Sequence, residues 1–372
     1  MTIKNSLRMS IAVLGCTLAL TACQSAPTSS VGNTEEGAAA AAAAAVRADA
    51  AKAPVTGGVP ESSPAVQPDK FVILIPCSQA SEGCAQPANG AAEAAKAIGW
   101  RTQIIDGKDT ADTQNAAIRQ AVALKPDGII TFAINPDSVQ GALNEAKNQG
   151  VKVVASSATP SDLVAFSDNP DADAWKLSGS LLADYAIAET GGQVKALVLH
   201  DTGFDVLEAR HDAFVDQLAN CGTCEVLEDQ TFTFSDLANS VPRLVQQMAQ
   251  RHPDFNTIYI DYDYAVPTLL QGLRSVNADG KIVLGSDGTS AAIKLIRDNG
   301  GQTATTAFAL GWLGWSGIDA LNRIFAGENP DEAAGAISVK LIDQTVAQDI
   351  SGLWEGDIDF RSAYLKMWGL SA

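Results

Sequence analysis

Short apolar runs alternate with segments of helical spacing from Lys70 almost to the end of the chain. In the first half the predicted strands are 70–76, 101–106, 128–134 and 151–156. The rhythm restarts with a helix from residue 173, and the later predicted strands are 194–200, 224–230, 257–261, 281–287 and 303–310. Strands that are apolar throughout and alternate with helices are typical of parallel sheets covered on both faces. The pattern predicts an α/β protein with two Rossmann-like lobes, each a parallel sheet flanked by helices.

The N-terminal residues follow a different pattern. Lys4 and Arg8 are the only charged side chains before Cys23, and residues 11–20 are almost entirely apolar. A basic head, a short apolar body and small residues at the cut are typical of a secretion signal, which is too short to span a bilayer comfortably. The sequence therefore predicts a signal peptide at residues 1–22.

The residues at the end of this signal carry a more specific pattern. Leu20-Thr21-Ala22-Cys23 resembles the lipobox of bacterial lipoproteins, a family in which the cysteine is acylated and becomes the mature N-terminus. Stable anchoring takes more than one acyl chain, which lipoproteins have. The resemblance implies lipidation of Cys23 and anchoring on the extracytoplasmic side of the cell envelope, in the periplasm of a Gram-negative cell. An ordinary signal peptide with a chance cysteine is the alternative.

Residues 23–68 contain almost no large apolar side chains. An alanine run at 38–45 is followed by a stretch rich in proline, glycine and serine. Such a segment cannot bury a core of its own. We expect a flexible tether here, in which the alanine run forms helix only transiently.

The charge of the chain limits its partners. The net charge is −18, and removal of Lys4 and Arg8 with residues 1–22 would make it −20. A strongly acidic chain is a poor match for nucleic acid or for an anionic membrane surface. We therefore expect no nucleic-acid partner, and membrane contact only through the lipid.

Four cysteines remain after Cys16 and Cys23, and they form two close groups, Cys77 with Cys84 and Cys221 with Cys224. An even number in an exported protein suggests disulfides, and four cysteines allow three pairings. We predict the two short-range bonds. A redox-active Cys221-Gly-Thr-Cys224 is the alternative, but reactive thiolates favour a helix N-terminus and this pair follows a predicted helix.

Several stretches carry a family resemblance in their order and spacing. They are KPDGIITFAINPDS, GVKVVASSA, FSDNPDADAWKLSGSLLADY, LEARHDAF, HPDFNTIYIDYDYAV, KIVLGSDGTSAAIKLIRDNG and YLKMWGL. Over about residues 70–370 the chain resembles type I periplasmic binding proteins of the ribose/galactose branch. DNA-binding repressors share this fold but begin with a helix-turn-helix, where this chain has a lipobox. The resemblance implies an N-terminal lobe of about 69–169 plus 309–345, a C-terminal lobe of about 170–308 plus 346–372, and a hinge of three crossovers.

The resemblance also implies a function. Such proteins close two lobes around one solute, by default a sugar, and deliver it as monomers to the permease and ATPase of an ABC importer, without cofactor or metal. A ligand-sensing subunit for a membrane kinase or chemoreceptor would use the same residues. An enzyme is not expected, because no Gly-x-Ser-x-Gly elbow, Walker loop or zinc spacing occurs around the three histidines, which are His200, His211 and His252.

The candidate ligand residues of the C-terminal lobe are polar. Asp287 ends a predicted strand, where a carboxylate can accept two hydroxyl hydrogen bonds. Arg210 matches an arginine that sugar-binding relatives place on the cleft side of a helix, and its planar fork suits a hydroxyl or a carboxylate. Tyr262 stands where relatives often have asparagine, and it can stack or donate its hydroxyl.

The N-terminal lobe departs from the sugar-binding pattern. Relatives often have an Asp-Arg pair where this chain has Ser157-Ala158, and the first loop of this chain has no aromatic residue. The candidate ligand residues of this lobe are therefore uncharged. The expected ligand residues are Ser78, Gln79, Ser81, Ser157, Phe308 and Trp312. Aromatic faces such as that of Trp312, expected near the hinge, suit sugar rings and less polar cyclic solutes alike. A less polar, cyclic or aromatic solute is therefore a second hypothesis for the ligand.

Overall fold

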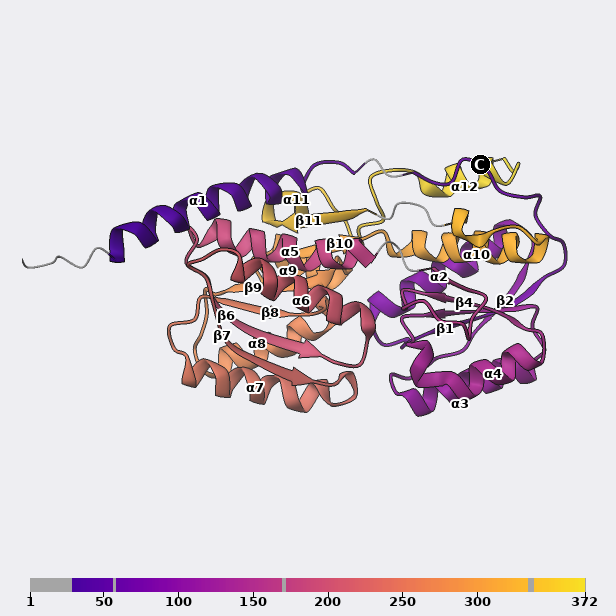
Figure 1. The fold of residues 1–372 in the computed structure, drawn as a ribbon, viewed down its shortest axis with the longest axis horizontal. Coiled ribbons are helices and arrows are strands. Elements are labelled where there is room, and N and C mark those ends of the chain that lie inside the picture. The colour runs from indigo at the N-terminus through magenta and orange to yellow at the C-terminus, as the bar shows by residue number, and fades with distance from the viewer. Residues whose placement is uncertain (1–28, 56–57, 169–171, 334–337, 372) are drawn as a thin grey trace, which may run out of the picture.

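The computed structural model describes residues 29–55, 58–168, 172–333 and 338–371, and it shows two α/β lobes side by side (Figure 1). Each lobe has one sheet flanked by helices, and every pair of neighbouring strands is parallel except one. This confirms the predicted fold class. Most of the strands are continuous runs of β-branched and other apolar residues with both faces buried under helices, whereas some strands at the sheet edges are partly polar and exposed.

The N-terminal lobe is built on a five-stranded sheet of order β2-β1-β3-β4-β5. Its strands are β1 Phe71–Pro76, β2 Arg101–Ile104, β3 Gly128–Phe132, β4 Lys152–Ser156 and β5 Phe166–Asp168. Helices α3 (Ala111–Ala123) and α4 (Gln140–Asn148), the latter preceded by the 3-10 turn η1 (Pro136–Val139), cover one face. Helices α2 (Glu82–Ala97) and α10 (Leu310–Ala326) cover the other face (Figure 1).

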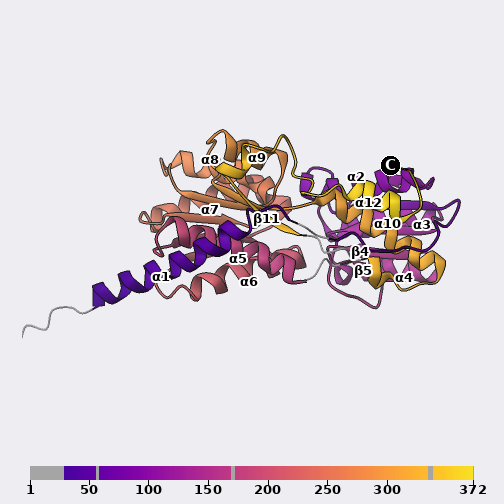
Figure 2. The same ribbon diagram turned by 90° about the horizontal axis from the view of Figure 1, so that it is seen from above.

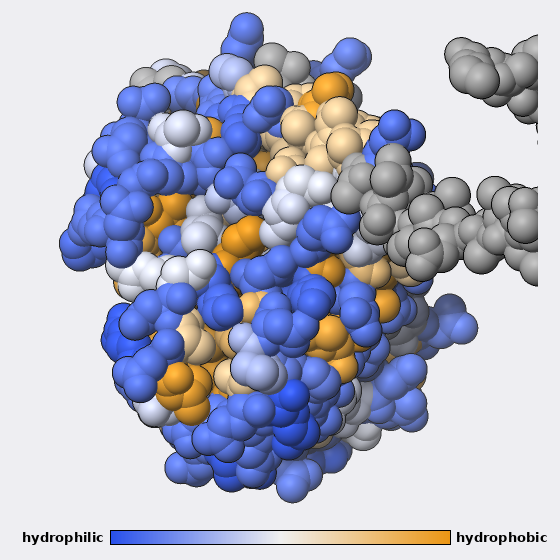
Figure 3. Space-filling view, turned by 90° about the vertical axis from the view of Figure 1, so that its left-hand side faces the viewer, coloured by the Kyte–Doolittle hydropathy of each residue, from blue (hydrophilic) through white to orange (hydrophobic). Residues whose placement is uncertain are grey.

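The C-terminal lobe has a six-stranded sheet of order β11-β10-β9-β8-β6-β7. Its strands are β6 Lys195–Asp201, β7 Glu225–Phe232, β8 Thr257–Ile260, β9 Ile282–Asp287, β10 Ala304–Phe308 and β11 Val339–Asp343, of which β11 pairs antiparallel with β10. The helices are α5 Ala172–Glu189, α6 Asp205–Ala219, α7 Leu237–Arg251, α8 Val266–Ser275, α9 Ser290–Arg297 and α11 Gln344–Ala347, with 3-10 turns η2 Phe234–Asp236 and η3 Asp263–Ala265. The face of the molecule seen in Figure 3 is largely hydrophilic, with hydrophobic residues showing in patches between the hydrophilic ones.

The path of the chain between the lobes corrects the predicted boundaries. From Phe71 onward the chain changes lobe after β5, after β10, after the 3-10 turn η4 (Pro330–Ala333) and after α11, which is one crossover more than the three expected. Strand β11 therefore belongs to the C-terminal lobe. Helix α12 (Phe360–Met367) returns to the N-terminal lobe, where Phe360 and Tyr364 pack against Trp312 and Trp315 of α10. The predicted placement of 346–372 in the C-terminal lobe is wrong for this helix.

The N-terminal segment also differs from the prediction. Ser29–Ala50 forms helix α1, which lies along α5 in Figure 2. Ala44 and Ala48 are buried in the core of the C-terminal lobe, and Arg47 forms a bidentate ion pair with Asp184 of α5, with N–O distances of 2.6 and 2.7 Å. Small alanine side chains let the two helices approach closely. A flexible tether is therefore wrong for this part, whereas residues 23–28 lie outside the described residues.

After α1 the chain crosses to the N-terminal lobe and follows α10. Asp319 accepts a hydrogen bond from Ser63 Oγ at 2.5 Å, Asn322 accepts one from the Gln67 backbone N–H at 2.9 Å, and Arg323 donates to a backbone carbonyl of this segment. The indole of Trp100 donates to the carbonyl of Gln67 at 2.7 Å. The segment thus forms an external strap that contacts both lobes.

Both short-range disulfides are present. Cys77–Cys84 joins the end of β1 to the first turn of α2, and Cys221–Cys224 closes the loop between α6 and β7. Cys221 follows the C-terminal end of α6, which agrees with a structural rather than a redox-active pair. None of the helices in the described ranges is long and apolar enough to span a bilayer.

Candidate functional site

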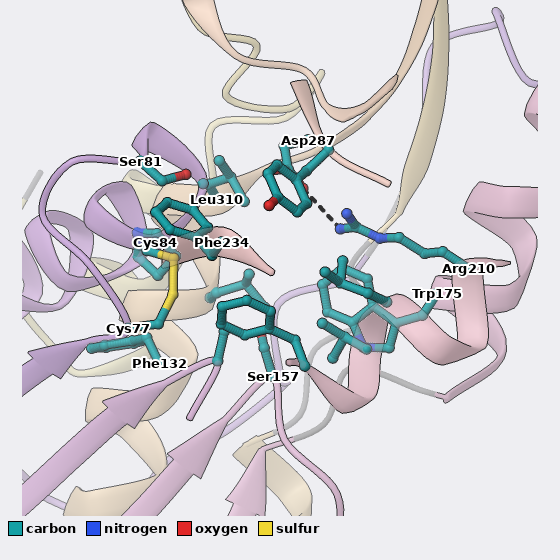
Figure 4. A pocket seen from close by; sticks show the side chains of 18 residues that line it. Cys77, Ser81, Cys84, Phe132, Ser157, Trp175, Arg210, Phe234, Asp287 and Leu310 are labelled. Atoms are coloured by element: carbon teal, nitrogen blue, oxygen red, sulfur yellow. Dashed lines mark ion pairs between the residues drawn. A yellow bond between two sulfur atoms is a disulfide. The ribbon is translucent and has the colours of Figure 1, made fainter. Parts of the chain in front are cut away.

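A cavity of about 60 Å³ lies between the two lobes, at the carboxyl ends of their strands (Figure 4). The N-terminal lobe contributes the Cys77–Cys84 disulfide, Ser81, Gly83, Pro87, Phe132, Ala133 and Ser157. The C-terminal lobe and the hinge contribute Trp175, Phe204, Val206, Leu207, Arg210, Phe234, Tyr262, Asp287, Leu310 and Leu313. Ligands of open α/β sheets bind outside the carboxyl ends of the strands, so this is the expected place for a ligand.

An ion pair forms the polar end of the cavity. Nη2 of Arg210 lies 2.9 Å from Oδ1 of Asp287, and Nη1 donates to the carbonyl of Asp261 at 3.2 Å. The guanidinium rests on the rings of Trp175 and Phe308, with Cζ 4.8 and 5.0 Å from their centroids. Nε of Arg210 is buried and has no hydrogen-bond partner among the described residues. The guanidinium is therefore fixed in position and keeps donor capacity.

Asp287 combines a strained backbone conformation with a buried carboxyl group. Its backbone φ is +108°, a region that side-chain-bearing residues rarely adopt. Burial raises the pKa of its carboxyl, an effect that the neighbouring Arg210 opposes. Strain of this kind persists where the surrounding structure enforces it and clusters at ligand sites. The backbone strain and the burial together make Asp287 a candidate ligand residue.

The position of Arg210 depends on a close helix contact. A Cβ atom built on Gly179 of α5 would lie 1.9 Å from the carbonyl oxygen of Arg210 on α6. Only glycine allows the two helices to approach this closely. The absence of a side chain at position 179 therefore sets the depth at which the guanidinium enters the cavity.

A buried polar network lies behind the cavity wall. The hydroxyl of Tyr262 donates to Asp201 at 2.7 Å, and Asp261 accepts hydrogen bonds from the Asp201 backbone N–H at 2.6 Å and from His200 Nδ1 at 2.9 Å. Burial raises the pKa of Asp201 to about 6. Burial lowers the pKa of His200, but Asp261 and Glu208 outweigh it and raise that pKa to about 9. The network immobilises Tyr262 and commits its hydroxyl.

This network predicts a dependence of stability on pH. The folded protein keeps the His200 proton up to about pH 9, whereas an unfolded histidine releases it near 6.5, so the free energy of unfolding should fall as the pH rises through this window. Urea titrations across the window measure the slope. His200→Gln should make the slope shallower and leave the part that comes from the raised pKa values of His211 and Asp263, whereas His252→Gln, outside these contacts, should not change it. An unchanged slope in His200→Gln would contradict the assignment.

Two sets of polar contacts close the lobes over the cavity. Glu82, at the start of α2, accepts hydrogen bonds from the backbone N–H and the hydroxyl of Ser290, both at 2.7 Å, at the start of α9. Asp205, at the start of α6, accepts from Asn135 and, at 2.6 Å, from Thr159. Carboxylates are favourable at helix N-termini, so these contacts suit the closed form.

Comparison with known proteins identifies the family. Residues 71–329, more than half of the chain, match the family described as periplasmic binding protein domain. The chain belongs to this family. Its members are binding proteins, which confirms that an enzyme is not expected, and they act outside the cytoplasmic membrane.

The individual relatives share only a low sequence identity with this periplasmic binding protein. The ribose import binding protein of Escherichia coli is 24% identical over 267 residues, 68% of this chain and 84% of the relative. A solute-binding protein of an ABC transporter from Mycobacterium smegmatis, solved with glycerol, has a TM-score of 0.66 at 20% identity and covers 78% of this chain and 100% of its own. The 5-methylthioribose-binding protein of Thermotoga lettingae has a TM-score of 0.65 at 16% identity and covers 84% and 95%.

Five of the predicted ligand residues lie on the wall of this cavity. They are Ser81, Ser157, Arg210, Tyr262 and Asp287. Ser78 and Gln79 lie elsewhere, because Ser78 accepts a hydrogen bond from the Ala80 backbone and Gln79 is exposed beside Asp106. Phe308 is fully buried beneath the guanidinium of Arg210 and supports it from behind. Contact of the wall residues with a solute stays a prediction.

Trp312 does not supply an apolar face to the cavity. Its ring is buried in the core of the N-terminal lobe, stacked on Phe360 with centroids 5.5 Å apart, and its indole N–H donates to Tyr364. The prediction for Trp312 is wrong, because its ring turns toward α12 and away from the cavity. Leu310 and Leu313 of the same helix line the cavity instead.

Most of the apolar wall was not anticipated from the sequence. The aromatic residues Phe132, Trp175, Phe204 and Phe234 all line the cavity. Phe132 lies within an apolar stretch, where an aromatic residue reads as core, whereas the other three are single aromatic residues beside polar or charged neighbours. Position offers the only signal, since Phe132 ends β3 and Phe234 follows β7 at the cleft edges of the sheets.

Proposed function

We propose that the protein is the lipid-anchored solute-binding component of an ABC importer. It takes up a small sugar or sugar-like solute between its lobes, closes around it by bending at the hinge, and presents the closed form to the permease. The observation that carries this proposal is the Arg210–Asp287 pair, buried in a cavity to which both lobes contribute. No bond of the solute needs to be broken in this cycle.

The relatives support a role in solute uptake. The curated relative from Escherichia coli is named a ribose import binding protein, and solved neighbours carry glycerol, allitol and 5-methylthioribose. All of these ligands have neighbouring hydroxyl groups. A charged fork beside a carboxylate is suited to such groups, because one hydroxyl can accept from the guanidinium and donate to the carboxylate.

Incubation with a natural solute pool tests this function. The purified protein, freed of bound solute by partial unfolding and refolding, is mixed with spent growth medium, re-isolated and analysed by native mass spectrometry. We expect one small solute per protein, and cells that lack the protein should lose uptake of that compound. Uptake that does not depend on the protein would contradict the transport role.

The lipid anchor has its own test. Cys23 lies outside the described residues, and its acylation follows from the resemblance to a lipobox. Cys23→Ser should leave uncleaved precursor or release mature protein from the membrane fraction, whereas Cys16→Ser, within the signal, should not. Fractionation followed by mass measurement of the mature N-terminus separates these results. A cleaved Cys23→Ser protein that still sediments with membranes would exclude this anchor.

A further inference from the structure

The polar capacity of the cavity is concentrated at one end. The guanidinium of Arg210 and the carboxylate of Asp287 are its charged groups, and they lie side by side (Figure 4). Among the described residues of the lining, the other side chains with polar atoms are Ser81, Ser157, Tyr262 and Trp175 through its indole N–H. The Tyr262 hydroxyl already donates to Asp201 and is not free to donate to a ligand.

The rest of the wall is apolar and comes from both lobes. The rings of Phe132, Trp175, Phe204 and Phe234 surround the space together with Leu207, Leu310 and Leu313. The Cys77–Cys84 disulfide lies on the side opposite Arg210 (Figure 4), and Pro87 also lines the cavity. Hydroxyl groups buried against these surfaces would lose their hydrogen bonds to water and gain none.

We propose that the solute is amphipathic, with adjacent hydroxyl groups along one edge and an apolar ring or short alkyl body elsewhere. This inference rests on the proposed function and narrows it, because a free pentose or hexose carries hydroxyl groups on every side. The adjacent hydroxyls bind Arg210 and Asp287. The apolar body lies among Trp175, Phe132 and Phe234.

The contacts that fix Arg210 and Asp287 in position explain why this ion pair selects two adjacent hydroxyl groups. Arg210 is held by the Asp261 carbonyl and by the ring faces of Trp175 and Phe308, so its unused Nε–H has a fixed direction. Asp287 is held by its strained backbone and by Arg210. Two rigid neighbouring groups match two hydroxyls on adjacent carbons, and the site has no second group of this kind among its described residues.

A matched pair of probes tests the inference. cis-1,2-Cyclohexanediol and myo-inositol share a six-membered carbon ring, but the first has two adjacent hydroxyls and the second has one on every carbon. By titration calorimetry at millimolar concentrations, the diol should bind at least about tenfold more tightly than myo-inositol or ribose, a ratio that corresponds to 1.4 kcal/mol.

Tryptophan variants provide a matched control. Trp175→Ala removes a ring from the cavity wall and should weaken diol binding about tenfold or more, as expected for a large buried aromatic contact. Trp312→Ala removes a buried ring of the N-terminal core and should lower the melting temperature while leaving diol affinity within about threefold. Equal losses of affinity in both variants would show that the effect is on folding and would overturn the inference.

The outcomes separate this inference from the function on which it rests. Tighter binding of ribose or myo-inositol than of the diol overturns the amphipathic solute but leaves solute binding intact. If the diol does not bind but the protein recovers a highly hydroxylated solute from spent medium, the amphipathic solute is likewise overturned and solute binding is kept. Recovery of no solute, together with no binding of any probe, overturns the inference and the proposed function together.

Discussion

Asp287→Asn is expected to weaken solute binding by roughly ten- to a hundredfold, because a charge-assisted hydrogen bond typically contributes about 1.5–3 kcal/mol. Asparagine has nearly the same shape and keeps an oxygen toward Arg210, so the fold should survive. The loss reflects two effects, since the solute hydroxyl loses a charged acceptor and Arg210 loses its buried counter-ion. Titration calorimetry with the solute recovered from the protein measures the change.

The control for this variant is Asp298→Asn. Asp298 follows α9 and pairs with Lys294 and Arg297 on the surface, away from the cavity. Exposed pairs contribute little, so affinity and stability should both stay close to those of the wild type. If Asp287→Asn binds the solute as tightly as the wild type, the polar end of the cavity is not where the solute is held.

Gly179→Ala is expected to lower the free energy of unfolding by about 2–3 kcal/mol, the upper part of the range for an overpacked interior. The added methyl group meets the backbone of Arg210 and not a flexible side chain, so α5 and α6 must separate. The same movement withdraws the guanidinium from Asp287. Urea unfolding gives the loss of stability, and calorimetry gives the accompanying loss of affinity.

Gly141→Ala is the matched control. Gly141 lies in the first turn of α4, and a Cβ there would meet only the end of the flexible, exposed Arg119 side chain at 3.1 Å. Alanine in a helix is more stable than glycine by roughly 0.5–1 kcal/mol, so this variant should be neutral or slightly stabilising. A Gly179→Ala protein as stable as Gly141→Ala would show that the close approach of α5 and α6 is not needed.

The alternation of strands and helices was predictable because most strands are buried on both faces and have unbroken apolar runs. Strand β11 was missed for a local reason, since Val339–Asp343 is short and contains the charged residues Lys340 and Asp343. Helix α12 was assigned to the wrong lobe because the crossover after α11 leaves no mark in composition. Lobe membership depends on which sheet a segment reaches, and apolar periodicity does not encode that.

The N-terminal segment shows how small residues mislead. An alanine run has no large side chain with which to form a core, so it reads as a tether. The same lack of bulk lets α1 lie close against α5, where Arg47 and Asp184 fix its register. Docking of this kind depends on a complementary surface elsewhere in the chain, which periodicity within the segment does not reveal.

The polar part of the site was easier to predict than the apolar part. Asp287 was found because a carboxylate at the end of an apolar strand needs an explanation, and Arg210 was found because it matches an arginine that sugar-binding relatives place on the cleft side of a helix. Trp175 and Trp312 are indistinguishable by that reasoning, since both lie in helices with apolar neighbours. Only the packing of α10 against α12 directs Trp312 into the core, while α5 presents Trp175 to the cleft.

The central claim is that solute bound at Arg210 and Asp287 closes the two lobes. Gln140 and Ser235 are exposed and follow strands at the cleft edges of the two sheets, one in each lobe. Spin labels on cysteines introduced at these two positions, in a Cys23→Ser background, give the distance between the lobes by pulsed electron resonance. With solute, the distance distribution should narrow to the short separation of the closed form, and without solute it should extend to longer distances. Asp287→Asn should need more solute to reach the same state. A distribution that solute does not change would contradict capture by closure.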